Sequence, residues 1–316
     1  MSKQYKKIVC AYSGGLDTSV MIPWLTEHYG AEIITYTGDL GQGEDLAAIK
    51  NKALNTGASH AVVDDLTDRF VEEFIWPAVR ASALYEGMYP MHTALGRPLL
   101  SARLVEVALE HGADAIAHGC TGKGNDQVRF ELTAKALAPE LGIIAPLREW
   151  ELTTRELEVD YAVERGIPIP ITKEKPYSID QNLWGCAIEC GEMEDLWAEP
   201  PDDAWLMTKD PANAPRGSIE VMMSFENGVP VAIDGRPMGG VELITYLKHA
   251  PVLAVEPHRL SSRLKYRTLL ERLVRWEQRP LEDRRDDRRQ LQRPGVVERL
   301  ELGRAIEPRV HLRDRR

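Results

Sequence analysis

The feature that most constrains the fold of this chain is a short apolar run that ends at two glycines and is followed by a helical pattern. Residues 8–12 predict a buried strand, and residues 18–28 predict a helix. Pro23 falls inside that helix and is expected to end its first turn or to kink it. Strand-like and helix-like segments alternate through the first 170 residues, which predicts a parallel sheet with helices on both faces.

Later segments continue this alternation and then change it. Strands are expected at residues 32–37, 60–66 and 115–118, and helices at residues 44–55, 99–110 and from a capping box at Thr153 and Glu156 to Gly166. Asn227-Gly228 lies between alternating runs at 218–225 and 229–233, which predicts a hairpin, and residues 241–248 suit a short helix. We therefore expect an α/β domain over residues 1–170, an α+β domain over residues 171–250 and a divergent Arg-rich tail over residues 251–316.

Charge and cysteine content narrow the class of protein. The net charge of −10 divides into +7 over residues 251–316 and −17 over the rest, and this acidic body argues against a nucleic-acid partner. Within the tail only residues 269–276 suit a helix, and the rest reads as poorly structured. Cys186 and Cys190 have the spacing of one helical face, but reduced, mostly buried thiols are expected rather than a metal site. No apolar run is long enough for a bilayer or a signal peptide, so a cytoplasmic protein without a membrane partner is expected.

The first glycine loop has the chemistry of an anion site. It lies between a strand and a helix, where free backbone N–H groups and the helix dipole favour a phosphate. Its spacing is neither that of a Walker A loop nor the G-x-G-x-x-G of a dinucleotide site. The alternative of a plain strand-to-helix turn is outweighed by the whole string, which is the signature of pyrophosphate-loop ATPases that adenylate their substrates. The loop reads Ser13-Gly14-Gly15-Leu16-Asp17-Thr18-Ser19.

The second glycine loop, residues 118–131, holds a hydroxyl, a lysine, an amide, a carboxylate and a guanidinium. Arg129 offers a fork for a carboxylate and Asp126 an acceptor for an ammonium, so the loop is expected to hold an amino acid by both α-groups. The alternative is a solvated helix cap at Asn125 or Asp126. Asp39, after the second strand, either reads the ribose or base of a nucleotide or belongs to a Gly-rich turn.

In this order, these stretches resemble argininosuccinate synthase over residues 6–247, about four-fifths of the chain. Members of that family are ATP-dependent ligases that join citrulline and aspartate, release AMP and pyrophosphate, and act in arginine biosynthesis. The resemblance implies a nucleotide-binding domain of the adenine nucleotide alpha hydrolase type, followed by an incomplete synthetase domain. It rests on residues 11–19, on Gly38-Asp39-Leu40-Gly41-Gln42, on residues 118–131 and on Pro176-Tyr177-Ser178-Ile179-Asp180-Gln181-Asn182-Leu183-Trp184.

The resemblance also implies where the substrates bind. Aspartate would lie against Thr121, Asn125 and Asp126, and citrulline against Tyr89, Asn125, Arg129 and Ser178. The implied reaction passes through citrullyl-AMP and needs no enzyme nucleophile, with Mg²⁺ accompanying ATP and a homotetramer as the family's assembly. ATP would be held by Ala11, Tyr12, Ser13, Gly14, Gly15, Leu16, Asp17, Thr18, Ser19, Gly38 and Gly119.

The chain also departs from the family pattern. Ala94 and Ala187 stand where many members have a serine near citrulline, and Cys186 stands where arginine is common. After residue 247 the family supplies a glutamate and a tyrosine to citrulline and then a long intersubunit helix, and neither is found in residues 251–316. A shifted reading frame or a truncated, diverged end would explain the tail. Two alternatives stay open: an ATP-binding remnant with impaired citrulline binding, and an RNA-thiolating enzyme that shares the phosphate loop.

Overall fold

The computed structural model describes residues 4–87, 89–168, 178–189, 219–249 and 296–302, and the single residues 195, 197 and 206. The chain divides into two compact units. The first consists of Met1–Ile75, Met91–Lys175 and Gln181–Leu183, and the second of Trp76–Pro90, Pro176–Asp180 and Trp184–Arg316. The predicted helix at residues 269–276, and Cys190, lie outside the described residues. The domain boundaries expected at residues 170 and 250 stay predictions.

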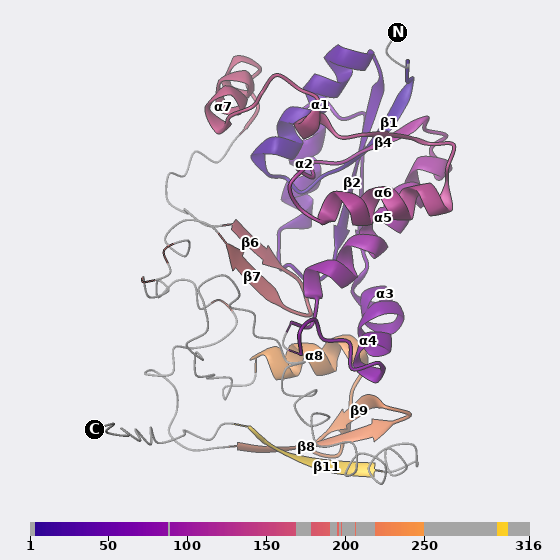
Figure 1. Ribbon diagram of the computed structural model, residues 1–316, viewed down its shortest axis with the longest axis vertical. Coiled ribbons are helices and arrows are strands. Elements are labelled where there is room, and N and C mark those ends of the chain that lie inside the picture. The colour runs from indigo at the N-terminus through magenta and orange to yellow at the C-terminus, as the bar shows by residue number, and fades with distance from the viewer. Residues whose placement is uncertain are drawn as a thin grey trace, which may run out of the picture. The chain divides into compact units, whose positions relative to one another are not determined.

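The first unit is built on a five-stranded sheet with the order β3-β2-β1-β4-β5, in which every pairing is parallel (Figure 1). The chain builds β1, β2 and β3 outward on one side and then adds β4 and β5 on the other side of β1. The strand order therefore reverses between β1 and β4, and open α/β sheets bind ligands outside the carboxyl ends of the strands at such a point. The strands are β1 (Lys7–Ala11), β2 (Glu32–Asp39), β3 (His60–Asp65), β4 (Ala115–Ala117) and β5 (Gly142–Ile144).

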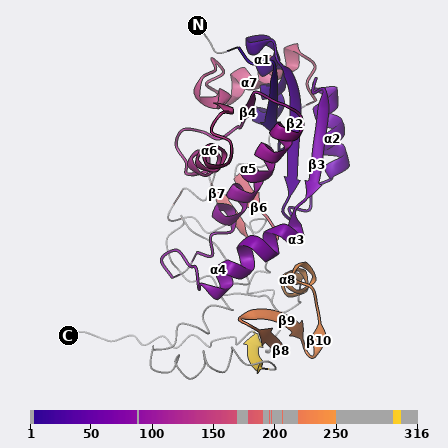
Figure 2. The same cartoon turned by 90° about the vertical axis from the view of Figure 1, so that its right-hand side faces the viewer.

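Helices cover both faces of this sheet, as predicted. α7 packs on α1, while α5 contacts β1, β2 and β4 and packs against α6 (Figure 2). The helical segments of this unit are α1 (Leu16–Tyr29), α2 (Leu46–Asn55), α3 (Thr67–Phe70), the π-helical turn η1 (Val71–Ile75), α5 (His92–Glu110), α6 (Asp126–Leu137), the 3₁₀ turn η2 (Pro146–Arg148) and α7 (Arg155–Glu164).

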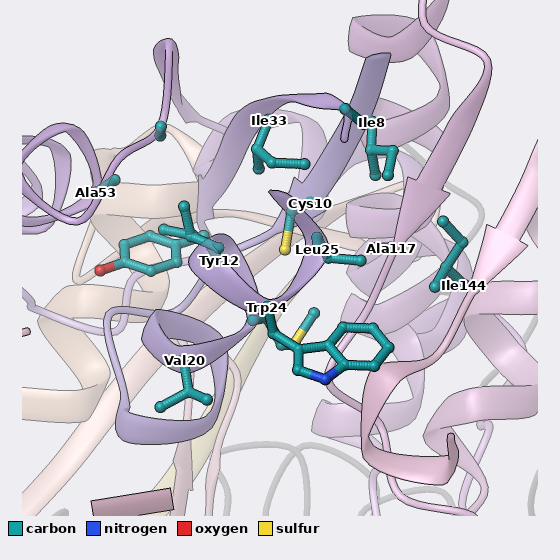
Figure 3. Packing of buried hydrophobic residues seen from close by; sticks show 14 of the residues in the cluster. Ile8, Cys10, Tyr12, Val20, Trp24, Leu25, Ile33, Ala53, Ala117 and Ile144 are labelled. Carbon is teal, nitrogen blue, oxygen red and sulfur yellow. The ribbon is translucent and has the colours of Figure 1, made fainter. Parts of the chain in front are cut away.

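The central strand is apolar on both sides. Ile8 and Cys10 of β1 join a core cluster with Trp24 and Leu25 of α1 (Figure 3). Val9, which is also fully buried, alternates with them and faces the other side of the sheet. Complete burial of one such aliphatic side chain contributes about 1.5–3 kcal/mol. The loop that joins β1 to α1 is therefore held at both ends by well-packed elements.

The helix predicted at residues 18–28 is confirmed as α1, which runs through Pro23 to Tyr29, because its fully buried face packs on the sheet and outweighs the lost backbone hydrogen bond. Two other local predictions for this unit are wrong. α5 begins at residue 92 rather than at 99 and contains Pro98. The cap of α7 is Thr154 rather than Thr153, since Thr154 accepts a hydrogen bond from the Leu157 N–H at 3.4 Å.

The second unit contains the predicted hairpin. Asn227 and Gly228 have φ angles of 51° and 76°, as a type I′ turn requires, and they join two antiparallel strands. A four-stranded sheet has the order β10-β9-β8-β11, and β6 pairs with β7. The elements are α4 (Trp76–Arg80), β6 (Ser178–Gln181), β7 (Cys186–Glu189), β8 (Ile219–Glu226), β9 (Val229–Ile233), β10 (Arg236–Pro237), α8 (Gly240–His249) and β11 (Val296–Leu302).

Two expectations about this unit need correction. The tail was expected to be poorly structured outside residues 269–276, yet residues 296–302 form β11 and pair antiparallel with β8. The pairing is long-range, so the local pattern of the tail did not reveal it. Cys186 lies in a strand rather than on a helical face, so its spacing to Cys190 has no helical meaning.

Gly41 is expected to be sensitive to substitution, because it has a φ of +85° and a Cβ there would lie 2.9 Å from the Leu183 Cβ and 3.1 Å from its backbone nitrogen. That nitrogen donates to the Leu40 carbonyl at 2.7 Å. Gly41→Ala should therefore lower the free energy of unfolding by about 2–4 kcal/mol, which urea denaturation measures. Gly43→Ala is the control, since Gly43 has a similar φ of +78° and nothing within 4 Å. Equal losses in the two variants would contradict the contact with Leu183.

Candidate functional site

The two glycine loops follow β1 and β4, which are neighbouring strands, and they meet at the carboxyl edge of the sheet. A Cβ on Gly119 would lie 3.3 Å from the Thr18 Cγ2 and 3.3 Å from the Met21 Sδ, so the second loop rests directly on the start of α1. The reversal of strand order between β1 and β4 places this contact where α/β folds bind ligands. The structure thus brings Gly119 together with the predicted phosphate loop.

The first loop exposes the amino end of a 14-residue helix. Gly15 is the N-cap of α1, and no side chain caps the helix at this position. The first helical hydrogen bond runs from the Ser19 N–H to the Gly15 carbonyl at 3.1 Å. The amides of Leu16, Asp17 and Thr18 precede that bond, and such amides carry the positive end of the helix dipole. The hydroxyl oxygens of Ser13 and Thr18 are 3.1 Å apart and share a hydrogen bond across the loop. This is the geometry of an anion site.

Tyr12 and Ser19, which were predicted to bind ATP, are buried, and their hydrogen bonds fix the backbone of the loop. The Ser19 hydroxyl donates to the Gly15 carbonyl at 2.6 Å, and its oxygen lies 3.2 Å from the Tyr12 hydroxyl. Thr37 of β2 donates to the Tyr12 carbonyl at 2.7 Å. Burial raises the pKa of Tyr12, which keeps its hydroxyl neutral. The side chains of these two residues therefore fix the backbone, while the amides in front of them stay available. Ala11 is the last residue of β1.

Gly38 and Asp39 lie at the end of β2. A Cβ on Gly38 would lie 2.5 Å from the Leu100 Cδ2 and 2.7 Å from the Tyr36 hydroxyl, so a larger residue there requires the ends of these side chains to shift. Asp39 uses one carboxylate oxygen to accept from the Gly41 N–H at 2.7 Å. The Gln42 side chain adds a donation to the Gly38 carbonyl at 3.1 Å. Of the two alternatives for Asp39, these hydrogen bonds favour a residue that stabilises the turn over one that binds the ribose or base of a nucleotide.

A charged cluster stands at the start of α6. Asp126 accepts from the Arg97 Nε at 2.7 Å and from the Arg129 Nη1 at 2.7 Å, and all three side chains are partly exposed. Asn125 is the N-cap of α6 without a side-chain cap, and Thr121 is exposed. The structure therefore gathers Asp126 and Arg129 and pairs them with each other. Arg97 was missed, because the predicted helix began only at residue 99; an α5 extended to its true start would have drawn attention to this arginine.

His118 anchors the beginning of the second loop. Its Nδ1 accepts from the Cys120 N–H at 3.3 Å, and its Nε2 lies 3.5 Å from a Glu131 oxygen that also accepts from Arg148 at 2.5 Å. Burial, the largest influence, lowers the pKa of His118 against the opposing effect of Glu131. A neutral imidazole with its proton on Nε2 fits this arrangement. His118 therefore supports the start of the second loop.

Tyr89 and Ser178 belong to the second unit. Tyr89 exchanges two backbone hydrogen bonds with Tyr85, of 2.8 Å and 3.0 Å, across a tight turn. Ser178 is the first residue of β6. Their assignment to citrulline stays a prediction.

Within the described residues, no three His, Cys, Asp or Glu side chains gather in a way that would hold a metal ion. The helices of this part of the chain also lack the combined length and apolar character that crossing a bilayer requires. Cys10, Cys120 and Cys186 are free thiols, and Cys10 and Cys186 are buried.

Two carboxyl groups meet beside the phosphate loop, and they make stability depend on pH. Burial, and then the charge of Asp17, raise the pKa of Glu158 on α7 from 4.5 to about 8. Between these values the folded chain holds this proton more tightly than the unfolded chain, so stability falls as pH rises through that window. Glu158→Gln should therefore flatten the decline of the melting temperature between pH 5 and pH 8. Asp160→Asn, an exposed site on the same helix, is the control, and an unchanged slope in Glu158→Gln would contradict the expectation.

Comparison with known families identifies the fold. A family model described as the arginosuccinate synthase N-terminal HUP domain matches residues 7–168, and one described as the arginosuccinate synthase C-terminal domain matches residues 177–252. The chain belongs to the argininosuccinate synthase family. The first match spans the whole parallel sheet and both glycine loops, so the predicted family and the pyrophosphate-loop fold are confirmed.

Individual synthases agree closely with the chain over the same region. It is 54% identical over 244 residues to the argininosuccinate synthase of Chlorobium luteolum, which covers 77% of this chain and 61% of that protein. The Chlorobium limicola synthase is 56% identical over 247 residues, with 78% and 61% covered, and that of Desulfitobacterium hafniense is 52% identical over 242 residues, with 77% and 60% covered. The chain therefore spans about three-fifths of the length of these synthases.

A solved structure of low similarity also matches part of the chain. The U34-tRNA thiolase NcsA from Methanococcus maripaludis superposes with a TM-score of 0.34 and 15% sequence identity, covering 54% of this chain and 60% of that one. A similarity of this size says nothing about the substrate of the present chain.

Proposed function

We propose that the chain is an argininosuccinate synthase, which converts ATP, citrulline and aspartate to argininosuccinate, AMP and diphosphate. The observation that carries the proposal is the meeting of two loops at the reversal of strand order. One presents the uncapped start of α1 to a polyphosphate, and the other leads to the charged cluster of Arg97, Asp126 and Arg129. Membership in the family supports citrulline and aspartate as the substrates.

The reaction needs positioning and charge stabilisation rather than an enzyme nucleophile. The citrulline ureido oxygen attacks the α-phosphorus of ATP, and diphosphate leaves as citrullyl-AMP forms. The aspartate amine then attacks the ureido carbon, loses a proton, and AMP leaves. The amides of Leu16, Asp17 and Thr18 would stabilise phosphate charge during the first step. Thr121, Asn125 and Asp126 would hold aspartate, and Asn125 and Arg129, with Tyr89 and Ser178, would hold citrulline.

Mg²⁺ is the expected companion of ATP, and one feature of the phosphate loop fits it. Magnesium prefers oxygen donors and is held in such sites by one or two carboxylates together with phosphates. Asp17, in the first turn of α1, is the carboxylate that fits this role. When bound, the ion would neutralise charge on the leaving diphosphate. Cytoplasmic localisation and a homotetramer stay predictions.

A diphosphate-release assay on the full chain tests the proposal. Release that requires both citrulline and aspartate is the expected result. ATP binding without release would instead support the ATP-binding remnant, in which citrulline binding is impaired. Turnover that requires tRNA would support the RNA-thiolating alternative.

A further inference from the structure

A lysine from α2 reaches the phosphate loop. The Lys52 Nζ donates to the Gly14 carbonyl at 2.6 Å. One turn earlier, Ile49 packs under the same residue, with its Cγ1 3.3 Å from the place of a Cβ on Gly14. Two contacts from one helix therefore fix the glycine at which the loop turns, with a φ of +78°.

The charge of Lys52 is not balanced within the described part of the chain. Its side chain is half-buried, burial lowers its pKa, and none of the ion pairs found among the described residues includes it. A partly desolvated ammonium without a carboxylate is costly, and a nearby anion relieves that cost. An ammonium has three N–H donors, and the Gly14 carbonyl takes one of them.

The direction from which Lys52 enters indicates which phosphates it would meet. α2 follows β2, whereas the charged cluster at Asp126 follows β4, and these two strands lie on opposite sides of β1. In phosphoryl and adenylyl transfer the attacking and leaving groups lie roughly in line across the phosphorus. If the amino-acid substrates occupy the β4 side, the leaving diphosphate lies toward β2 and Lys52.

We propose that Lys52 is a positioning residue of the phosphate loop, which turns the Gly14 carbonyl away from the anion and sets a positive charge beside the β- and γ-phosphates. The inference rests on the proposed function, because it assigns a role within that ATP site. It predicts selective recognition of ATP and diphosphate over AMP, since AMP lacks the phosphates that lie near the ammonium.

Calorimetric titration of the full chain with ATP, inorganic diphosphate and AMP tests this role. Lys52→Met should weaken the binding of ATP and diphosphate roughly tenfold to thirtyfold, as expected for the loss of one partly desolvated charge contact, and the binding of AMP by less than about twofold. Lys52→Arg should recover most of the loss because it keeps the charge. Lys50→Met is the matched control, since Lys50 is an exposed lysine on the same helix.

Each result decides between roles. Equal weakening of ATP and AMP, or no recovery by Lys52→Arg, would show that Lys52 only supports the fold and would overturn the inference. Unchanged diphosphate binding in Lys52→Met would do the same. If Lys52→Met does not fold, Lys52→Gln takes its place, with the weaker salt dependence of diphosphate binding as the readout. Absence of ATP and diphosphate binding in the unsubstituted chain would instead overturn the proposed function itself.

Discussion

Replacing Asp126 with alanine is expected to reduce diphosphate release about 100-fold or more at saturating ATP. The carboxylate holds two guanidinium groups, those of Arg97 and Arg129, at 2.7 Å each. Removing this shared acceptor disturbs both guanidinium groups. Because all three side chains are partly exposed, solvent screens part of the cost in stability, and the main effect is expected on substrate positioning. Both arginines would then lose this shared acceptor at the place where the amino-acid substrates are expected to bind.

The binding constants separate this effect from a general loss of structure. ATP affinity should change less than about twofold, since Asp126 lies beyond the phosphate loop, whereas aspartate affinity should fall with turnover. Glu27→Ala is the matched control. Glu27 also accepts from an arginine, Arg165, at 2.9 Å, but it stands in the last turn of α1, away from the glycine loops. Asp126→Ala with turnover close to that of the control would exclude the cluster from the substrate site.

Gly14→Ala is expected to weaken ATP binding at least tenfold. Gly14 has a φ of +78°, in a region that costs an L-residue about 1–2 kcal/mol. The new Cβ would also lie 3.3 Å from Ile49, and α2 packs against β3 and cannot easily withdraw. The loop would relieve this strain by turning its peptides, and we expect the amides of those peptides to bind the phosphates. Fluorescence or calorimetric titration with ATP measures the loss.

Gly235→Ala controls for the backbone strain alone. Gly235 has a φ of +77°, nothing within 4 Å, and a place in the second unit. It should lose stability to a similar degree while keeping the ATP affinity of the unsubstituted chain. Undiminished ATP binding in Gly14→Ala would mean that this loop does not hold the phosphates.

The sequence predicted those parts of the fold that depend on local pattern. Buried strands, glycine-rich loops and the Asn227-Gly228 turn all leave their signal within a few neighbouring residues, and the structure confirms them. The parallel sheet with helices on both faces then followed from the usual behaviour of alternating strands and helices. The loop predicted to bind phosphate could be recognised in the sequence because its amides, its glycines and its helix are contiguous.

The remaining parts of the site depend on contacts between distant residues. Arg97 meets Asp126 across 29 positions, and Lys52 meets Gly14 across 38 positions. Only the packing of α5 and α2 on the sheet creates these pairs, so an isolated arginine or lysine in the sequence carries no sign of them. Pro23 and Pro98 both lie inside helices, because tertiary packing preserves helices that the local preference of proline would interrupt.

The strand β11 gives the Arg-rich tail a protective role in the second unit. β8 pairs with β9 on one side, and without β11 its other side would present a row of unpaired backbone groups that can template aggregation. Residues 296–302 pair with that side of β8 from Ile219 to Phe225. The family match ends at residue 252, yet residues 296–302 of the same chain pair with this edge strand. Removing the tail would therefore leave a surface prone to self-association rather than a smaller, equally well-behaved domain.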